Sequence, residues 1–207
     1  MTPSLYINPD IAGDEGQGAR PLHPGGGANQ LRVRAYNERL VLSLVRRNVG
    51  LSKADIARLS GLSAQTVSVI MRALEKDGLL KRGDPVRGKV GKPSIPMALD
   101  PDGVFSFGLK IGRRSAELIL MDFVGTVRAS LNEAYKYPTP DGIRKFVRAS
   151  VEQLSRGLST MHRQRIAGIG IAAPFELWNW VEEVGAPPED MSAWREVDLI
   201  VIIGEIV

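Results

Sequence analysis

Apolar residues recur at helical spacing in three consecutive segments between residues 37 and 78. The first segment ends near Gly50 and carries one apolar stripe, formed by Leu40, Val41, Leu44 and Val45. The second is short, and its apolar residues Ile56 and Leu59 are expected to face inward. The third covers residues 64–76 and repeats apolar residues at i, i+3, i+4 and i+7, namely Val67, Ile70, Met71 and Leu74. The pattern therefore predicts three consecutive amphipathic helices.

Capping residues mark the ends of the second and third helices. Ser52 stands three residues before Asp55, which is the spacing of a capping box in which each side chain accepts a bond from the other's backbone amide. Gly61 stops the second helix and Ser63 caps the third. Gly78 suits the left-handed conformation that ends many helices.

Two short strand-like pieces, residues 79–82 and 94–99, follow the helices. The segment between them is rich in glycine and carries three basic residues, Arg87, Lys89 and Lys92. Three helices followed by a hairpin with a basic tip predict a winged helix-turn-helix domain over residues 31–100.

A cluster of turn residues at 100–103 is the expected boundary of a second domain, residues 101–207. Beyond the boundary the hydrophobic period changes to two. The pattern predicts three strands, a helix and a returning strand, at residues 104–111, 116–122, 126–133, 143–161 and 166–173. This order is typical of the opening of an α/β layer domain, so the fold class is α+β or α/β.

The two ends of the chain depart from this regular pattern. Residues 1–30 are rich in Gly and Pro with few large apolar side chains, and are expected to form a disordered arm. Residues 175–198 look loop-like, and the aliphatic run at 199–207 ends without a further helix, so one sheet edge and one sheet face are expected to lack cover. The loop-like stretch holds three tryptophans, which are more typical of a core or interface than of a sugar-stacking site: Trp178, Trp180 and Trp194.

Composition excludes or disfavours several kinds of chemistry. The 207 residues include no cysteine and only two histidines, which argues against disulfides, a thiolate metal site, a cysteine nucleophile and a histidine-built centre. No apolar run approaches the roughly 18 residues needed to span a bilayer, and the start of the chain lacks the apolar core of a signal peptide. We therefore expect a cytoplasmic protein with no membrane partner, catalytic residue, cofactor or metal.

Positive charge is concentrated between Leu31 and Leu99, where 14 basic residues stand against five acidic ones, a formal charge of +9. The segments before and after carry −2 and −3. A basic block beside a mildly acidic remainder indicates a module that faces nucleic acid, joined to a part that does not. A solvated basic surface is the alternative.

The third helix has the residues expected of a helix that reads double-stranded DNA in the major groove. Gln65 suits bidentate bonding to adenine, Arg72 suits guanine or a phosphate, and Ser68 tolerates several bases. Val69, or the methyl group of Thr66, suits contact with a thymine methyl. The alternative is that all five are ordinary solvent-facing residues.

The three basic residues of the wing are separated by glycines that allow close approach of the backbone to DNA. Arg87, Lys89 and Lys92 are therefore expected to contact a narrow minor groove or its flanking phosphates. A flexible basic loop without a partner is the alternative.

Several of these segments together resemble the N-terminal region of ROK-family transcriptional repressors (Repressor, ORF, Kinase), in particular the xylose and N-acetylglucosamine repressor branch. Those that carry the resemblance in the winged helix are residues 51–57, 61–68, 74–80 and 91–94. Residues 107–112 and 169–174 are similar to the first lobe of the family's actin-like (ribonuclease H-like) sugar-kinase fold. The resemblance implies operator binding by a homodimer through two winged helices, with a sugar effector that releases DNA.

The chain departs from the family pattern in two ways. Family kinases place a carboxylate that organises Mg²⁺ and ATP where this sequence has Lys110, followed by Arg113 and Arg114 in a predicted turn. The length is roughly half of what both lobes and a DNA-binding domain require, so the chain is expected to be a truncated product that lacks most of the effector site. Two alternatives stay open: a sugar kinase, and a winged-helix module whose trailing domain contacts a partner without an effector.

Overall fold

Helix α1 (Gly25–Arg47) begins well before the residue at which the hydrophobic pattern turns helical. The computed structural model describes residues 25–48, 50–85 and 95–207, so the expected arm over residues 1–24 lies outside the described part. The expectation of disorder is wrong for residues 25–30, which are helical. Gln30 to Ala35 are mostly good helix formers, which extends the helix before Asn37, whereas Gly25 to Gly27 are poor helix formers and give no local signal for it.

The helix-turn-helix pair consists of α2 (Lys53–Ser60) and α3 (Ala64–Lys76). The predicted capping box is confirmed: Asp55 N donates to Ser52 Oγ at 3.1 Å, and Ser52 N donates to Asp55 Oδ2 at 3.2 Å. Leu59 does not face inward as expected, because it is 51% exposed. The buried side of this two-turn helix is centred on Ile56 and continues toward Ser60, which leaves Leu59 on its flank.

The wing strands β1 (Leu80–Arg82) and β2 (Met97–Leu99) form an antiparallel pair in which Leu80 lies opposite Leu99. They close a core that also takes residues from all three helices, and its buried members are Val41, Val45, Ile56, Val67, Ile70, Met71, Leu74, Leu80, Met97 and Leu99. The predicted tip residues Arg87, Lys89 and Lys92 lie outside the described residues.

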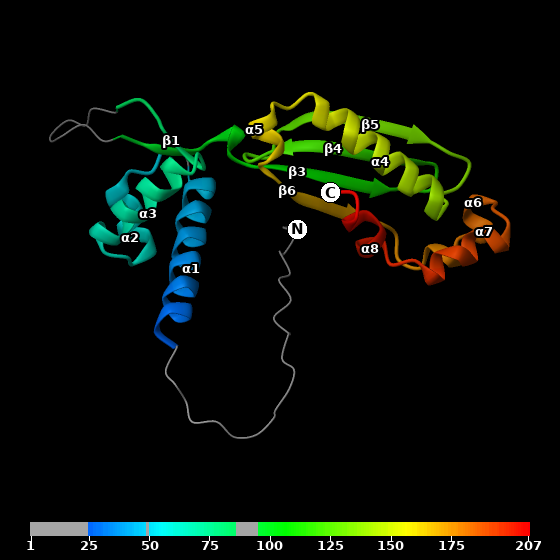
Figure 1. The fold of residues 1–207 in the computed structure, drawn as a ribbon, viewed down its shortest axis with the longest axis horizontal. Helices are drawn as coiled ribbons and strands as arrows, with labels where there is room; N and C mark the ends of the chain where they lie inside the picture. Colours follow the sequence, from blue (N-terminus) through cyan, green and yellow to red (C-terminus); the bar gives the residue numbers. More distant parts are fainter. Residues whose placement is uncertain (1–24, 49, 86–94) are drawn as a thin grey trace, which may run out of the picture. The chain divides into compact units, whose positions relative to one another are not determined.

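A short 3-10 helix η1 (Pro101–Gly103) leads into a four-stranded mixed sheet with the order β5-β4-β3-β6 (Figure 1). Three strands form an antiparallel meander: β3 (Phe105–Ile111), β4 (Ser115–Asp122) and β5 (Val127–Ala134). Strand β6 (Ile166–Ala172) then runs parallel to β3, with Phe107 opposite Ile169. All strands lie within a few residues of their predicted bounds, and residues Asn37–Val207 form one compact unit.

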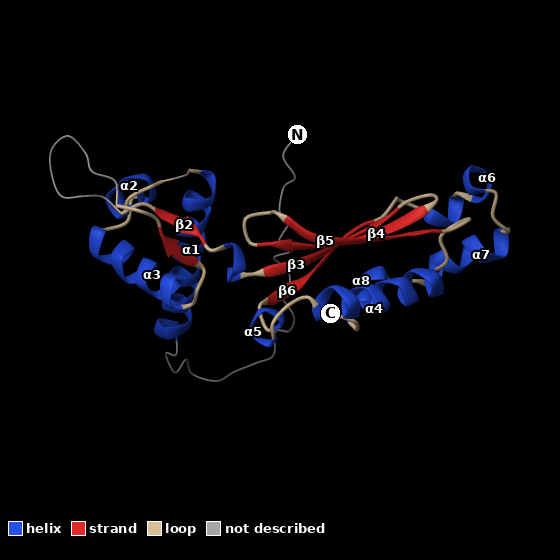
Figure 2. Cartoon of the chain, turned by 90° about the horizontal axis from the view of Figure 1, so that it is seen from above, coloured by secondary structure: helices blue, strands red, loops and turns tan. Residues whose placement is uncertain are grey.

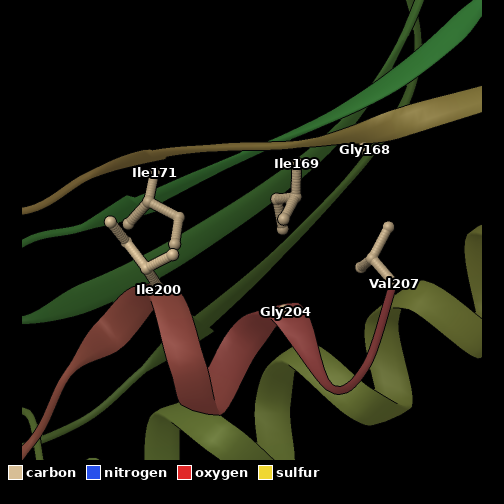
Figure 3. A pocket seen from close by; sticks show the side chains of 6 residues that line it. All are labelled: Gly168, Ile169, Ile171, Ile200, Gly204 and Val207. Carbon is tan, nitrogen blue, oxygen red and sulfur yellow. The ribbon is translucent and has the colours of Figure 1, made fainter. Parts of the chain in front are cut away.

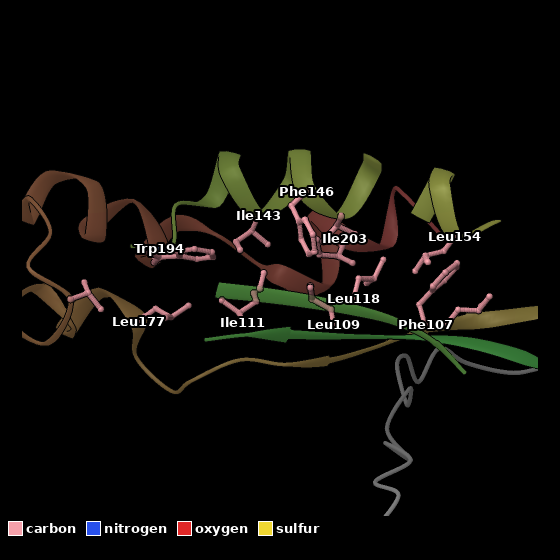
Figure 4. Packing of buried hydrophobic residues seen from close by; sticks show 14 of the residues in the cluster. Phe107, Leu109, Ile111, Leu118, Ile143, Phe146, Leu154, Leu177, Trp194 and Ile203 are labelled. Carbon is pink, nitrogen blue, oxygen red and sulfur yellow. The ribbon is translucent and has the colours of Figure 1, made fainter. Parts of the chain in front are cut away.

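One face of the sheet is covered by helix α4 (Pro140–Arg156) and by the C-terminal helix α8 (Leu199–Gly204), which lie on the same side (Figure 2). Alternate side chains of β3 and β4 point to this side and pack against Ile143, Phe146 and Ile203 (Figure 4). The predicted helix at 143–161 is split in the structure, because Gly157 ends α4 and Ser159 caps a separate short helix, α5 (Thr160–Arg163).

The C-terminal stretch is more helical than the sequence pattern indicated. Residues expected to be loop-like contain η2 (Leu177–Asn179), α6 (Val181–Val184), α7 (Pro188–Ser192) and η3 (Ala193–Glu196). The aliphatic run expected to end without a helix forms α8, because the Asp198 carboxylate accepts from the amides of Ile200 and Val201. Trp194 is a core residue, 3% exposed, and its Nε1 donates to Pro138 O at 3.0 Å.

Candidate nucleic-acid interface

Helix α3 presents opposite faces to the core and to solvent. Val67, Ile70, Met71 and Leu74 are buried against the other helices. Gln65, Val69 and Arg72, at positions i, i+4 and i+7, are all exposed, and the exposed fraction of Val69 is 52%. Thr66 and Ser68 flank this row and are half-buried. The structure therefore brings the five predicted reading residues onto neighbouring positions of one helix.

The N-terminus of α3 is closed by Ser63. The Thr66 amide donates to Ser63 Oγ at 3.1 Å, and the two hydroxyl groups form a second hydrogen bond, 2.8 Å between Oγ and Oγ1. The Thr66 hydroxyl is therefore already engaged within the helix. Ser63 itself is exposed beside Gln65.

Arg72 is held close to the helix that carries it, because its Nε donates to Ser68 O at 3.1 Å. The terminal nitrogens of the guanidinium have no bond to the described residues in the structure. A guanidinium fixed at Nε keeps a fork of donors that suits the O6 and N7 atoms of guanine or a phosphate.

Arg82, the last residue of β1, forms an ion pair with Glu75 on α3. Arg82 donates from Nε to Glu75 Oε1 at 2.5 Å and from its terminal nitrogen to Oε2 at 3.0 Å. The two bonds from Arg82 lower the pKa of the Glu75 carboxyl, and the same bonds raise the pKa of Arg82. This pair links the end of β1 to the last turns of α3.

The turn between α2 and α3 depends on Gly61, whose φ of +69° is the left-handed conformation that favours glycine. Asp55 on α2 is paired with the exposed Arg58 at 2.8 Å. Hydrogen bonds from the Ser52 side chain and backbone, with the charge of Arg58, lower the pKa of Asp55 despite partial desolvation. The carboxylate of Asp55 is thus engaged by the cap of α2 and by Arg58.

One residue near α3 that the sequence did not single out is Arg165, which directly precedes β6. Its Nη1 atom donates to Asp77 O at 3.0 Å and to Gly103 O at 2.8 Å. Asp77 is the C-cap residue of α3. No local sequence signal could have found this contact, because the partners are 88 and 62 positions away along the chain.

The second region has no arrangement typical of a catalytic or metal centre among the described residues. Lys110 is exposed and lies opposite Glu117 in the β3–β4 register. Arg113 and Arg114 are both exposed, and Arg114 donates to the carbonyls of Lys136 and Val184, which are far from it along the chain. Within the described ranges, no group of three or more His, Asp or Glu side chains is placed to hold a metal ion.

An apolar groove of about 480 Å³ lies between β6 and α8 (Figure 3). The residues that line it are Gly168, Ile169, Ile171, Ile200, Gly204 and Val207. None carries a polar side chain, so a sugar hydroxyl placed there would lack side-chain hydrogen-bond partners. No helix of the described residues is both long and apolar enough to cross a bilayer.

A capped helix pair followed by an antiparallel two-stranded wing defines the winged helix-turn-helix class of DNA-binding domains. The winged helix-turn-helix DNA-binding family matches residues 34–81, which confirms the predicted class of fold for this part of the chain. A crystal structure of a ROK-family transcriptional regulator, a homologue of the E. coli MLC protein, superposes with a TM-score of 0.51 at 19% identity. The match covers 69% of this chain and 36% of that chain, and shows that the chain has the fold of part of that regulator.

Curated relatives point to the same family. The xylose repressor of Bacillus spizizenii is 23% identical over 180 residues, which are 86% of this chain and 45% of the repressor. The DNA-binding transcriptional dual regulator NagC of Escherichia coli K12 is 29% identical over 123 residues, 58% of this chain and 29% of that protein. An uncharacterized protein of Sinorhizobium fredii, y4fQ, is 24% identical over 140 residues, 68% of this chain and 36% of that protein.

The chain spans less than half the length of each of these relatives. It is a winged helix-turn-helix domain followed by a region like part of a ROK-family regulator, and the resemblance drawn from its sequence motifs is confirmed.

Proposed function

We propose that this protein is a sequence-specific transcriptional regulator that binds operator DNA through α3 and the wing. The observation that carries the proposal is the exposed row on α3, in which Gln65, Val69 and Arg72 stand opposite a fully buried apolar face. A helix packed on one side and polar on the other can enter the major groove without losing its own core contacts. Arg87, Lys89 and Lys92 are proposed to contact the DNA backbone beside it.

More specifically, we propose that the protein represses sugar-metabolism genes and binds, as a homodimer, an operator with two-fold symmetry. Support comes from the names of two relatives, the xylose repressor of Bacillus spizizenii and the N-acetylglucosamine repressor of Escherichia coli O6:H1, which is 29% identical over 123 residues. A dimer places two α3 helices in successive major grooves about one helical turn apart, so the operator is expected to be palindromic. Because the protein is proposed to act on operator DNA, we place it in the cytoplasm.

The family resemblance implies a sugar effector. The apolar lining of the groove between β6 and α8 does not suit a sugar. We therefore expect operator binding by this chain to be insensitive to sugars, as in the alternative of a winged-helix module with a trailing partner-interaction region. Sugar kinase activity is disfavoured, because an ammonium at Lys110 repels the Mg²⁺ that accompanies ATP.

The test is a DNA-binding titration of the full chain on the DNA upstream of its own reading frame, at several salt concentrations. The logarithm of the binding constant should fall linearly with the logarithm of salt concentration, by about 0.9 for each phosphate contacted. Footprinting at low salt should protect a site whose two halves are related by symmetry. Binding that does not change with salt, or DNA left unprotected at low salt, contradicts the proposal.

Arg87→Ala provides an internal check on the wing. This substitution should weaken binding to all DNA sequences about equally, since a backbone contact carries no sequence information. A selective loss on the operator contradicts the assignment of Arg87 to backbone contact and favours base readout instead.

A further inference from the structure

The C-terminal end of α3 is packed tightly against η1 and the residues before β6. The amide of Asp100 donates to Leu79 O at 3.0 Å, and Phe123 packs on the edge of the winged-helix core. A Cβ atom added to Gly103 would lie only 2.7 Å from Gly78 O. The backbone of η1 therefore lies at a distance from the turn after α3 that only glycine permits.

Arg165 completes this packing with a single polar group. Its half-buried guanidinium donates from Nη1 to Asp77 O, at the end of α3, and to Gly103 O, in η1. The last carbonyls of a helix lack partners within the helix and carry the negative end of its dipole, so a cation that bonds to one of them is doubly favoured. One side chain thus bridges two separate backbone segments.

A glycine at position 78 makes room for the guanidinium. Gly78 has a φ of +71°, and a Cβ atom added there would lie 2.8 Å from Arg165 Nη2. A side chain at position 78 would therefore require the Arg165 guanidinium to shift.

The position of Arg165 is in turn fixed by the sheet. Its carbonyl accepts from the Phe105 amide at 3.0 Å, and the next residue, Ile166, pairs with Phe105 in the β3–β6 register. Its own amide donates to His162 O at 3.0 Å. A displacement of the start of β6 would move the guanidinium, and with it the end of α3.

We propose that Arg165 is a positioning residue for DNA recognition, which fixes the orientation of α3 relative to the β-sheet region through the Asp77 and Gly103 carbonyls. This inference rests on the proposed function, because the orientation of α3 affects specificity only if α3 reads DNA. Arg165 does not touch DNA; it sets the angle at which Gln65 and Arg72 reach the groove.

The first experiment measures the orientation without DNA. The chain has no cysteine, so Lys76→Cys on α3 and Arg148→Cys on α4, both exposed, accept a pair of spin labels specifically. The parent should give one narrow distance distribution. Arg165→Ala should broaden or shift it, and Arg165→Lys should give an intermediate result, because an ammonium is a point donor that cannot replace the planar guanidinium.

Arg163→Ala is the matched control. Arg163 is exposed, lies two residues away, and donates to the carbonyls of Leu158 and Arg156 within its own region. It should leave the label distances unchanged. An unchanged distribution in Arg165→Ala overturns the proposal, and so does an equal broadening in both variants. If Arg165→Ala fails to fold, as judged by circular dichroism, Arg165→Lys supplies the decision on the same criteria.

The second experiment measures DNA affinity at a temperature where all variants are folded. Arg165→Ala should lower affinity for the operator by about tenfold, within the range of ordinary coupling energies, and leave affinity for non-specific DNA nearly unchanged. A merely stabilising role predicts no change in this ratio, and an unchanged ratio overturns the proposal when the parent binds its operator. If the parent binds no DNA, the proposed function fails, while the label distances still decide whether Arg165 fixes α3.

Discussion

Ser63 and Thr66 form two hydrogen bonds with each other across the first turn of α3. The Thr66 amide donates to Ser63 Oγ at 3.1 Å, and the two hydroxyl groups form the second bond at 2.8 Å. Ser63 is exposed at the end of the helix that we propose enters DNA. Ser63 therefore both stabilises the helix and lies where DNA is proposed to approach. Different substitutions at this residue can change one of these properties without the other.

Ser63→Ala should destabilise the domain by about 1 kcal/mol through loss of the cap. Ser63→Asp should retain the stability, because aspartate caps well and its charge suits the positive end of the helix dipole. The same negative charge should abolish operator binding by repelling phosphates. Urea denaturation and a binding titration of the two variants check this, and tight DNA binding by Ser63→Asp contradicts the placement of the α3 N-terminus at DNA.

Gln65→Ala and Arg72→Ala should each weaken operator binding by about 1–3 kcal/mol and relax the preference for one base pair, if both read base edges. Titrations against operators with single base changes measure both effects. Gln153→Ala and Arg148→Ala on α4 are controls of the same chemistry, because both residues are exposed on a helix outside the winged helix. The controls should bind like the parent; equal losses in tests and controls contradict direct readout.

Asp122 should make the stability of the sheet region sensitive to acid. This buried carboxylate is raised in pKa by desolvation, but bonds from Arg128 Nε at 2.6 Å and from the amides of Thr126 and Val124 outweigh burial and lower its pKa below the ordinary value. Because the folded value is the lower one, the stabilisation is complete above the ordinary pKa of aspartate, near 4, and is lost as pH falls through the lowered value.

Asp122→Asn should therefore cost about 2 kcal/mol at pH 7, from the loss of charged hydrogen bonds, and progressively less as the pH approaches 3. Urea denaturation across this pH range measures the difference. Asp141→Asn is the control, since Asp141 is exposed in a pair with Arg144. A cost for Asp122→Asn that stays constant down to pH 3 contradicts the lowered pKa.

Gly78→Ala tests the space occupied by the Arg165 guanidinium. In the parent, alanine should cost about 1–2 kcal/mol for the left-handed conformation, and more because its Cβ meets Arg165 Nη2. In an Arg165→Ala background only the conformational cost remains, so Gly78→Ala should be less destabilising there. Gly61→Ala is the control, because Gly61 has a similar φ of +69° with no atom within 4 Å of the added Cβ. Its cost should be the same in both backgrounds.

The winged helix was predictable from sequence because its signals are local. Ser52, Ser63 and Gly78 mark helix ends through bonds within a few residues, and the apolar spacing of α3 gives its buried face directly. The strands of the sheet were found for the same reason, since strict alternation in β3 and β4 reports one covered face. The exposed row on α3 was predictable because it lies on the side of the helix opposite its buried apolar residues.

The sequence predictions failed where the structure depends on contacts between residues far apart in the chain, or where a hydrophobic pattern is short. Leu59 is apolar and correctly spaced, but a two-turn helix buries a narrower face than the spacing implies. The aliphatic run 199–207 resembles a strand, and the cap supplied by Asp198 together with burial of Ile203 under α4 and the sheet makes it a helix. Arg165 carries no local signal, because its acceptors are brought to it by the fold.

Both ends of α3 are closed before any DNA is present, at one end by the Ser63 hydroxyl and at the other by the guanidinium on Asp77 O. A reading element that is already rigid loses little conformational entropy on association. Its complex with DNA should form as a nearly rigid-body encounter, with a small negative heat-capacity change rather than the large one that accompanies coupled folding.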